Sequence, residues 1–171
     1  QGRTLLGIKG LMVREKEKIM QYGLKASEVL ATYLYTGPEF VLFNGICRSF
    51  PPSMLDLLKG DGTTPDNRLC TTLFCLSSAL RKLSRFTPLP PGLKVYRGLG
   101  QQDMPKQFLV PHGSPPWLGG VERSFMSTTA DKSIVAIGYC TVVEIGVGRV
   151  QIGGDVSFLS MVHPTLSQPR P

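Results

Sequence analysis

The side chains best suited to chemistry begin with the stretch Val95-Tyr96-Arg97-Gly98-Leu99-Gly100. Arg97 is expected near the end of a strand, where its guanidinium can hold two phosphate oxygens at once. Gly98 has no Cβ, so a ligand can approach the backbone closely there. Taken alone, the same residues also fit a strand-end arginine that reaches water, followed by a turn glycine.

A second stretch, Ser124-Phe125-Met126-Ser127-Thr128-Thr129, carries several hydroxyl groups. At the end of a strand such groups can donate hydrogen bonds to a ribose or hold a catalytic side chain in place. Taken alone, the stretch also fits an exposed strand rim, because threonine favours strands.

A third stretch, Leu34-Tyr35-Thr36-Gly37-Pro38-Glu39, precedes an apolar segment. Glycine followed by proline breaks a helix, so the stretch is expected to form the corner between two helices. By itself this corner indicates packing and no chemistry.

The elements that position these residues are expected to be helical in the first half of the chain. Helices are predicted over residues 28–35, with Ser27 as the N-cap, over residues 39–48, and from about Pro65 onwards. Leucines at spacings of three and four between Leu69 and Leu83 predict the buried face of the third helix.

After the proline-rich run at residues 88–92 the pattern becomes one of short strands. Strands are predicted over residues 93–99, 123–129, 141–147 and 156–162, with a short helix over residues 131–139. Helices followed by strands indicate an α+β fold with an antiparallel or mixed sheet. We predict one domain over residues 1–160, helical to about residue 90, and a disordered proline-rich tail over residues 161–171.

The composition argues against several classes of partner. The net charge is +7, but no nucleic-acid recognition motif accompanies it, so no nucleic-acid partner is expected. Apolar runs are shorter than the roughly 20 residues of a membrane helix, and we expect a monomer without a membrane partner. Cysteines and histidines lack metal-ligand spacing, which predicts no metal site. No signal peptide is visible in this segment, and mostly buried free thiols weakly favour the cytoplasm, although the compartment stays unknown.

Five motifs in order resemble the NAD(P)-dependent arginine-specific mono-ADP-ribosyltransferases of the R-S-E type. The matching residues are 35–38, 96–98, 125–129, 143–145 and 157–160, and the resemblance covers most of the chain. It implies a helical part followed by a split β-sandwich. It also implies transfer of ADP-ribose from NAD, or from NADP, to an arginine of an acceptor protein with release of nicotinamide.

The resemblance also implies roles for single residues. Arg97 would contact the NAD phosphates, and the backbone of Gly98 would bond the nicotinamide amide. Ser127 would support the ribose and the catalytic glutamate, with Thr128 and Thr129 shaping the strand. Arg97 and Ser127 are thus the implied catalytic residues, and all five are implied to bind the cofactor.

The chain departs from the family after Ser160, where the family continues to a Glu-x-Glu pair. Thr165 and Ser167 occupy the two glutamate positions, and no acidic residue follows Asp155. A carboxylate beside the ribose would stabilise the oxocarbenium-like transition state, whereas a hydroxyl carries no negative charge at neutral pH. Transfer is therefore expected to be reduced or lost.

Other carboxylates are not expected to replace the missing pair. Glu144 is predicted to be structural within its strand, Asp155 to lie in a turn after two glycines, and Glu122 to be solvated. Three hypotheses remain open: a weakened transferase, a catalytically dead module that binds NAD or a protein, and a truncated or frameshifted form of an active enzyme.

Overall fold

The computed structural model describes residues 7–56, 58–60, 68–100, 103–136, 141–148 and 153–161. The chain divides into two compact units. The first comprises Gln1–Leu89 with Ile152–Pro171, and the second comprises Pro90–Gln151. The boundary between Leu89 and Pro90 lies within the proline-rich run at which the sequence pattern changes.

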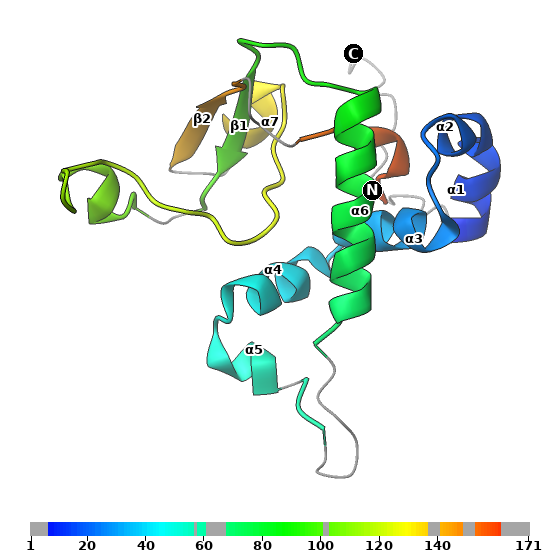
Figure 1. Ribbon diagram of the computed structural model, residues 1–171, viewed down its shortest axis with the longest axis horizontal. Coiled ribbons are helices and arrows are strands. Elements are labelled where there is room, and N and C mark those ends of the chain that lie inside the picture. The colour runs from blue at the N-terminus through cyan, green and yellow to red at the C-terminus, as the bar shows by residue number, and fades with distance from the viewer. Residues whose placement is uncertain are drawn as a thin grey trace, which may run out of the picture. The chain divides into compact units, whose positions relative to one another are not determined.

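The first unit is helical. Its elements are α1 (Ile8–Arg14), α2 (Lys16–Gln21), α3 (Ala26–Tyr35), α4 (Phe40–Arg48), α5 (Pro52–Asp56), α6 (Cys70–Phe86) and the 3-10 helix η2 (Ser157–Leu159) (Figure 1). In the part of the chain that the structure describes, no helix is long and apolar enough to cross a membrane.

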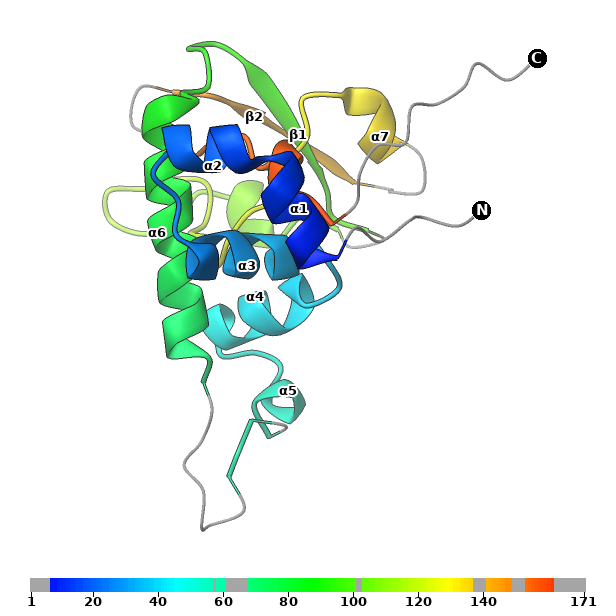
Figure 2. The same ribbon diagram turned by 90° about the vertical axis from the view of Figure 1, so that its right-hand side faces the viewer.

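The core of the first unit lies where α3 packs against α6, the long green helix of Figure 2. Leu76, Ala79 and Leu83 form the fully buried face of α6, so the predicted leucine stripe is confirmed at Leu76 and Leu83, whereas its other leucines are only half-buried. Leu11 of α1 and Leu159 of η2 are also fully buried. Burial of one leucine side chain contributes about 1.5–3 kcal/mol, so these few contacts fix the helices against one another.

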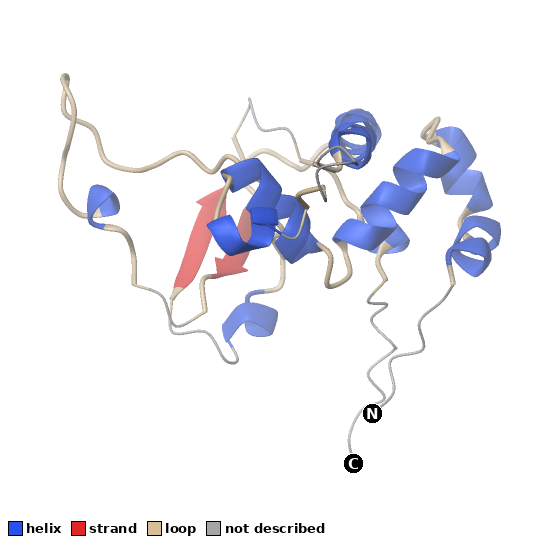
Figure 3. Ribbon diagram, turned by 90° about the horizontal axis from the view of Figure 1, so that it is seen from below, coloured by secondary structure: helices blue, strands red, loops and turns tan. Residues whose placement is uncertain are grey.

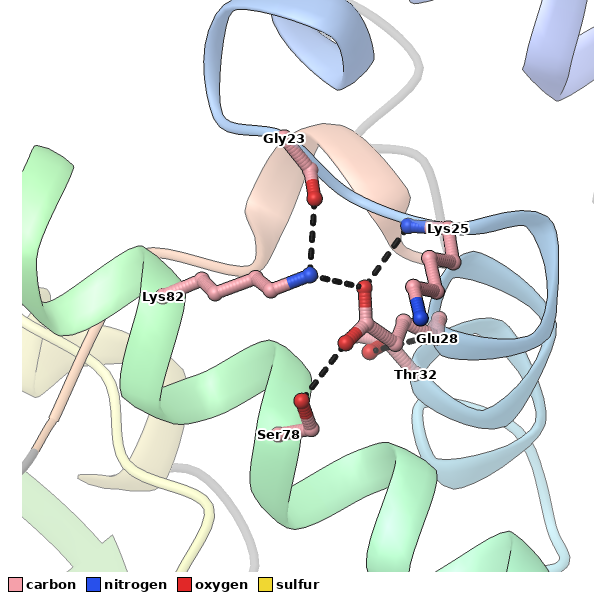
Figure 4. Close-up of polar contacts among 6 residues, drawn as sticks. All are labelled: Gly23, Lys25, Glu28, Thr32, Ser78 and Lys82. Carbon is pink, nitrogen blue, oxygen red and sulfur yellow. Dashed lines mark hydrogen bonds and ion pairs between the residues drawn. The ribbon is translucent and has the colours of Figure 1, made fainter.

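A buried carboxylate joins α3 to α6 inside this unit. Glu28 is 3% exposed and accepts hydrogen bonds from Ser78 Oγ at 2.6 Å and Lys82 Nζ at 2.8 Å (Figure 4). It also accepts the backbone N–H of Lys25 at 2.7 Å, and Lys82 donates to the carbonyl of Gly23 at 2.7 Å. Burial alone would raise the pKa of Glu28, but these hydrogen bonds and the charge of Lys82 outweigh it and lower the pKa.

Two predicted helix starts are wrong. The helix predicted from residue 28 begins at Ala26, and its cap is Lys25 rather than Ser27, because the Glu28 carboxylate satisfies the Lys25 N–H. The third predicted helix begins at Cys70, after Leu69 in the left-handed region at φ 49°. Pro65, where it was predicted to open, lies outside the described residues.

The second unit contains a two-stranded antiparallel sheet, drawn in red in Figure 3. Strand β1 (Lys94–Gly98) pairs with β2 (Val142–Gly146), so that Tyr96 lies opposite Glu144 and Arg97 opposite Val143. The short helix α7 (Lys132–Ala136) packs against β1, and a 3-10 helix η1 (Lys106–Phe108) lies in the segment between them. The predicted combination of helices and an antiparallel sheet is confirmed.

Two predicted strands are wrong. Residues 123–129 form no strand, and only Thr129 is bridged to Tyr96. Glu122 accepts the Ser124 N–H at 2.9 Å and turns the chain at the start of this stretch. Within residues 156–162, residues 157–159 form η2, because Asp155 accepts the Ser157 N–H at 2.8 Å and starts a helical turn.

The described cysteines form no disulfide among themselves. Cys70 is exposed at the start of α6, whereas Cys47 and Cys75 are half-buried. The expectation of mostly buried thiols is therefore wrong for Cys70, whose side chain lies on the surface of an amphipathic helix. Cys140 lies outside the described residues.

The buried ion pair predicts how the first unit unfolds. Lys82→Met should lower the free energy of unfolding by roughly 3 kcal/mol, because Glu28 would keep its charge without its cation. Arg81→Met, on the exposed side of the same helix, should change it by less than about 0.5 kcal/mol. Chemical denaturation checks both values, and equal losses would contradict the role of the pair.

The same pair predicts a pH dependence with a fixed sign. Because the folded pKa of Glu28 is lowered, its contribution is present above the ordinary glutamate value of about 4.3 and is lost as pH falls through the folded value. The melting temperature of the natural chain should therefore fall more steeply below about pH 4.3 than that of Glu28→Gln. Circular dichroism measures the melting temperature of both chains at each pH. Equally steep decreases in the two chains would contradict this prediction.

Candidate functional site

The candidate site is built on the edge of β1 that faces away from β2. Tyr96 donates its N–H to the carbonyl of Thr129 at 2.7 Å and accepts the Thr129 N–H at 3.0 Å. Both backbone polar groups of Tyr96 therefore bond Thr129, although its side chain lies opposite Glu144 on β2. Because the bridge is antiparallel, the residues that precede Thr129, including Ser127, run alongside the end of β1 at Gly98.

Arg97 lies beside the hydroxyl-rich segment. Its Nη1 donates to the backbone carbonyl of Ser127 at 3.4 Å, and Ser127 is exposed. A guanidinium has five N–H donors, and this contact uses one of them. The structure therefore places a permanent positive charge next to the end of the segment that carries the serine and threonine side chains.

The other predicted binding residues lie along the same edge. Gly98 ends β1 opposite Val142, and Thr128 is exposed. The Thr129 hydroxyl accepts the N–H of Asp131 at 3.1 Å, so it holds the start of α7 and shapes the chain after the bridge. Thr165 and Ser167 lie outside the described residues.

Glu144 belongs to the opposite face of the sheet. Successive side chains of a strand point to opposite faces, so Tyr96 and its partner Glu144 share one face and Arg97 lies on the other. Lys94 Nζ contacts Glu144 Oε1 at 2.6 Å, and this hydrogen bond lowers the pKa of Glu144 and raises that of Lys94. The predicted structural role of Glu144 agrees with this pairing.

The remaining carboxylates considered as replacements are held in turns. Glu122 is exposed and accepts the N–H and the hydroxyl of Ser124, at 2.9 and 2.7 Å. In the first unit, Asp155 accepts the Ser157 N–H in the turn that leads into η2, in agreement with the predicted turn. No carboxylate of the described residues forms an ion pair or a hydrogen bond with Arg97.

Sequence reasoning missed a third acid of the second unit, Asp131. Its Oδ1 accepts the N–H of Ser133 at 2.9 Å and the Ser133 hydroxyl at 2.7 Å. The hydroxyl hydrogen bond and then the backbone one lower its pKa. The signal was the Asp-Lys-Ser sequence, in which an aspartate two residues before a serine caps a helix.

The two remaining motifs meet in the first unit. The Thr36 hydroxyl of the helix corner accepts the N–H of Met161, directly after the Ser-Phe-Leu-Ser segment, at 2.8 Å. Sequence reasoning assigned this corner to packing alone and missed Thr36. The partner of this hydroxyl lies 125 residues away, so the sequence around Thr36 does not indicate the bond.

Within the described ranges, no group of three histidine, cysteine, aspartate or glutamate side chains is placed to hold a metal ion. Comparisons with family models, curated proteins and solved structures find no match for the chain.

The pairing of Glu144 predicts an asymmetry between the two faces of the sheet. Glu144→Gln removes the negative charge that pairs with Lys94 but leaves the Arg97 face unchanged, so the affinity for any anionic ligand of Arg97 should stay within about twofold. The thermal stability should change little, because the pair is exposed. Equilibrium titration with inorganic pyrophosphate measures the affinity, and a large change would place Glu144 in the site.

Proposed function

We propose that this chain is an NAD-binding domain of the arginine-specific mono-ADP-ribosyltransferase type, in which transfer of ADP-ribose to a protein arginine is reduced or lost. The observation that carries the proposal is the contact between Arg97 Nη1 and the carbonyl of Ser127 at 3.4 Å. Two motifs that lie far apart in the sequence become neighbours there, as a common dinucleotide site requires.

The chemistry of these groups supports a dinucleotide as ligand. The guanidinium of Arg97 matches the geometry of phosphate oxygens and keeps its charge at any physiological pH. The backbone at Gly98 can approach a flat nicotinamide ring without a Cβ in the way. Hydroxyl groups at residues 127–129 can donate to ribose oxygens, and NADP would present the same groups to this edge.

The distribution of carboxylates supports binding over transfer. Cleavage of the bond between nicotinamide and ribose builds positive charge on the ribose, which a nearby carboxylate would stabilise. Three described carboxylates of the second unit are engaged elsewhere, since Glu122 bonds Ser124, Asp131 bonds Ser133 and Glu144 pairs with Lys94. The positions of the family's glutamates hold Thr165 and Ser167.

The split β-sandwich is part of the proposal. The paired strands β1 and β2 and the bridge to Thr129 supply three neighbouring chain segments of such a sheet. The order of the five motifs supports the assignment of these segments. An acceptor arginine on another protein would be the partner of an active form.

Arg97→Ala should weaken NAD binding by roughly 10- to 100-fold, because charge-assisted hydrogen bonds contribute about 1.5–3 kcal/mol. Arg123→Ala removes an exposed cation of the same unit and should leave the affinity nearly unchanged. Calorimetric titration with NAD, repeated with NADP, measures both. A folded natural chain that binds neither dinucleotide would end the proposal.

Glutamates at positions 165 and 167 should restore the cleavage of NAD. In Thr165→Glu/Ser167→Glu, release of nicotinamide from labelled NAD should rise about 100- to 1000-fold, the usual effect of one preorganised electrostatic group. Thr165→Gln/Ser167→Gln has the same side-chain length without the charge and should gain nothing. If both variants bind NAD and release nicotinamide at equal rates, the transferase part of the proposal is contradicted, and a binding module remains. A gain would also agree with a truncated or frameshifted form of an active enzyme.

A further inference from the structure

One hydroxyl group connects the helix corner at residues 35–38 to the segment that ends the described chain. Thr36 Oγ1 donates to the carbonyl of Tyr33 at 2.8 Å and accepts the backbone N–H of Met161 at 2.8 Å. The first bond orients the hydroxyl, because its proton points back into α3 and its lone pair is left towards Met161. The contact spans 125 residues of sequence.

Gly37 provides the space for the Met161 side chain. A Cβ at this buried position would lie 2.6 Å from the Sδ and 2.7 Å from the Cε of Met161, closer than nonbonded atoms approach. The glycine therefore permits a close approach of the two segments. Since its φ is not in the left-handed region, space and not backbone conformation explains glycine here.

The segment before Met161 is held to the same unit along its length. Leu159 is fully buried in the helical core. The ring of Phe158 packs edge-on against Tyr22, with 5.7 Å between centroids, and lies under Lys18 Nζ at 5.3 Å. At the start of the segment, the Asp155 N–H bonds Thr87 Oγ1 at 3.2 Å. Thr36 is thus the final described hydrogen-bonding partner on this path.

We propose that Thr36 and Gly37 are positioning residues that fix the chain at Met161, directly after Ser160. The proposed function gives this point its importance, because positions 165 and 167 follow Met161 by only four and six residues. On the proposed function, the corner therefore anchors the chain shortly before the two positions that correspond to the family's glutamates.

Thr32 provides a matched control within the same helix. Its hydroxyl donates to the carbonyl of Glu28 at 2.8 Å, as that of Thr36 does to Tyr33, but its bond stays within α3. Thr32 is also fully buried. Replacement of either hydroxyl by a methyl group removes one helix hydrogen bond, and only replacement at Thr36 removes the bond to Met161.

The test measures amide hydrogen exchange at Met161 in the full chain without any nucleotide. Selective labelling with ¹⁵N-methionine gives one amide signal for each of the six methionines. Met161→Leu identifies the signal of Met161, and Met12 in α1 reports on the fold of the same unit. The exchange rates are compared in the natural chain and in Thr36→Val, Thr36→Ser and Thr32→Val.

Thr36→Val should speed exchange at Met161 by at least about tenfold, as expected for loss of a hydrogen bond worth about 1.5 kcal/mol, and should leave Met12 unchanged. Thr36→Ser should restore the slow rate, and Thr32→Val should not affect Met161. Equal exchange at Met161 in the natural chain and in Thr36→Val would overturn the proposal, as would equal acceleration in Thr32→Val.

Gly37→Ala keeps the proposal testable if Thr36→Val does not fold. The added methyl group meets the end of the Met161 side chain and, at 2.8 Å, Glu39 Oε2; both side chains are flexible and can move away, so the helices should remain folded while exchange at Met161 accelerates. An unchanged rate in Gly37→Ala would overturn the role of Gly37. Because no nucleotide is present, failure of NAD binding would count against the proposed function and leave this result standing.

Discussion

The pair of backbone hydrogen bonds between Tyr96 and Thr129 is the constraint on which the candidate site depends. These bonds bring the segment that contains Ser127 to the free edge of β1, where the guanidinium of Arg97 reaches its carbonyl. A single bridge suffices because β1 is already fixed on its other edge by β2. Without the bridge, the hydroxyl groups of this segment would have no fixed position relative to Arg97 on β1.

The alternation of side chains along the strands then determines which charged groups lie on the same face of the sheet. Tyr96, Glu144 and Lys94 share one face of the sheet, where Lys94 and Glu144 satisfy each other. Arg97 lies on the other face, where one of its donors bonds the Ser127 carbonyl. Under the proposed function its remaining donors would hold an anion, while the paired Glu144 would be held away from the ribose. The proposal therefore assigns binding and the loss of transfer to different residues.

The helical unit has its own organising interaction, the Glu28 carboxylate between α3 and α6. A carboxylate this well buried is tolerated only because Lys82, Ser78 and the Lys25 N–H surround it. The network fixes α3, and α3 ends in the corner that carries Thr36. Through Thr36 the order of the helical core extends to Met161.

The sequence by itself determined the helices with a regular apolar face and the two paired strands, because these follow from local spacing and side-chain chemistry; it also supplied the candidate residues of the site. It also determined the absence of acidic groups after Asp155. Only the tertiary structure decided that residues 123–129 contribute one bridge instead of a strand, that residues 157–159 form a helical turn, and that Thr36 holds Met161. Each of these depends on a partner distant in the chain or on a competing side-chain hydrogen bond, and the local pattern of residue types encodes neither.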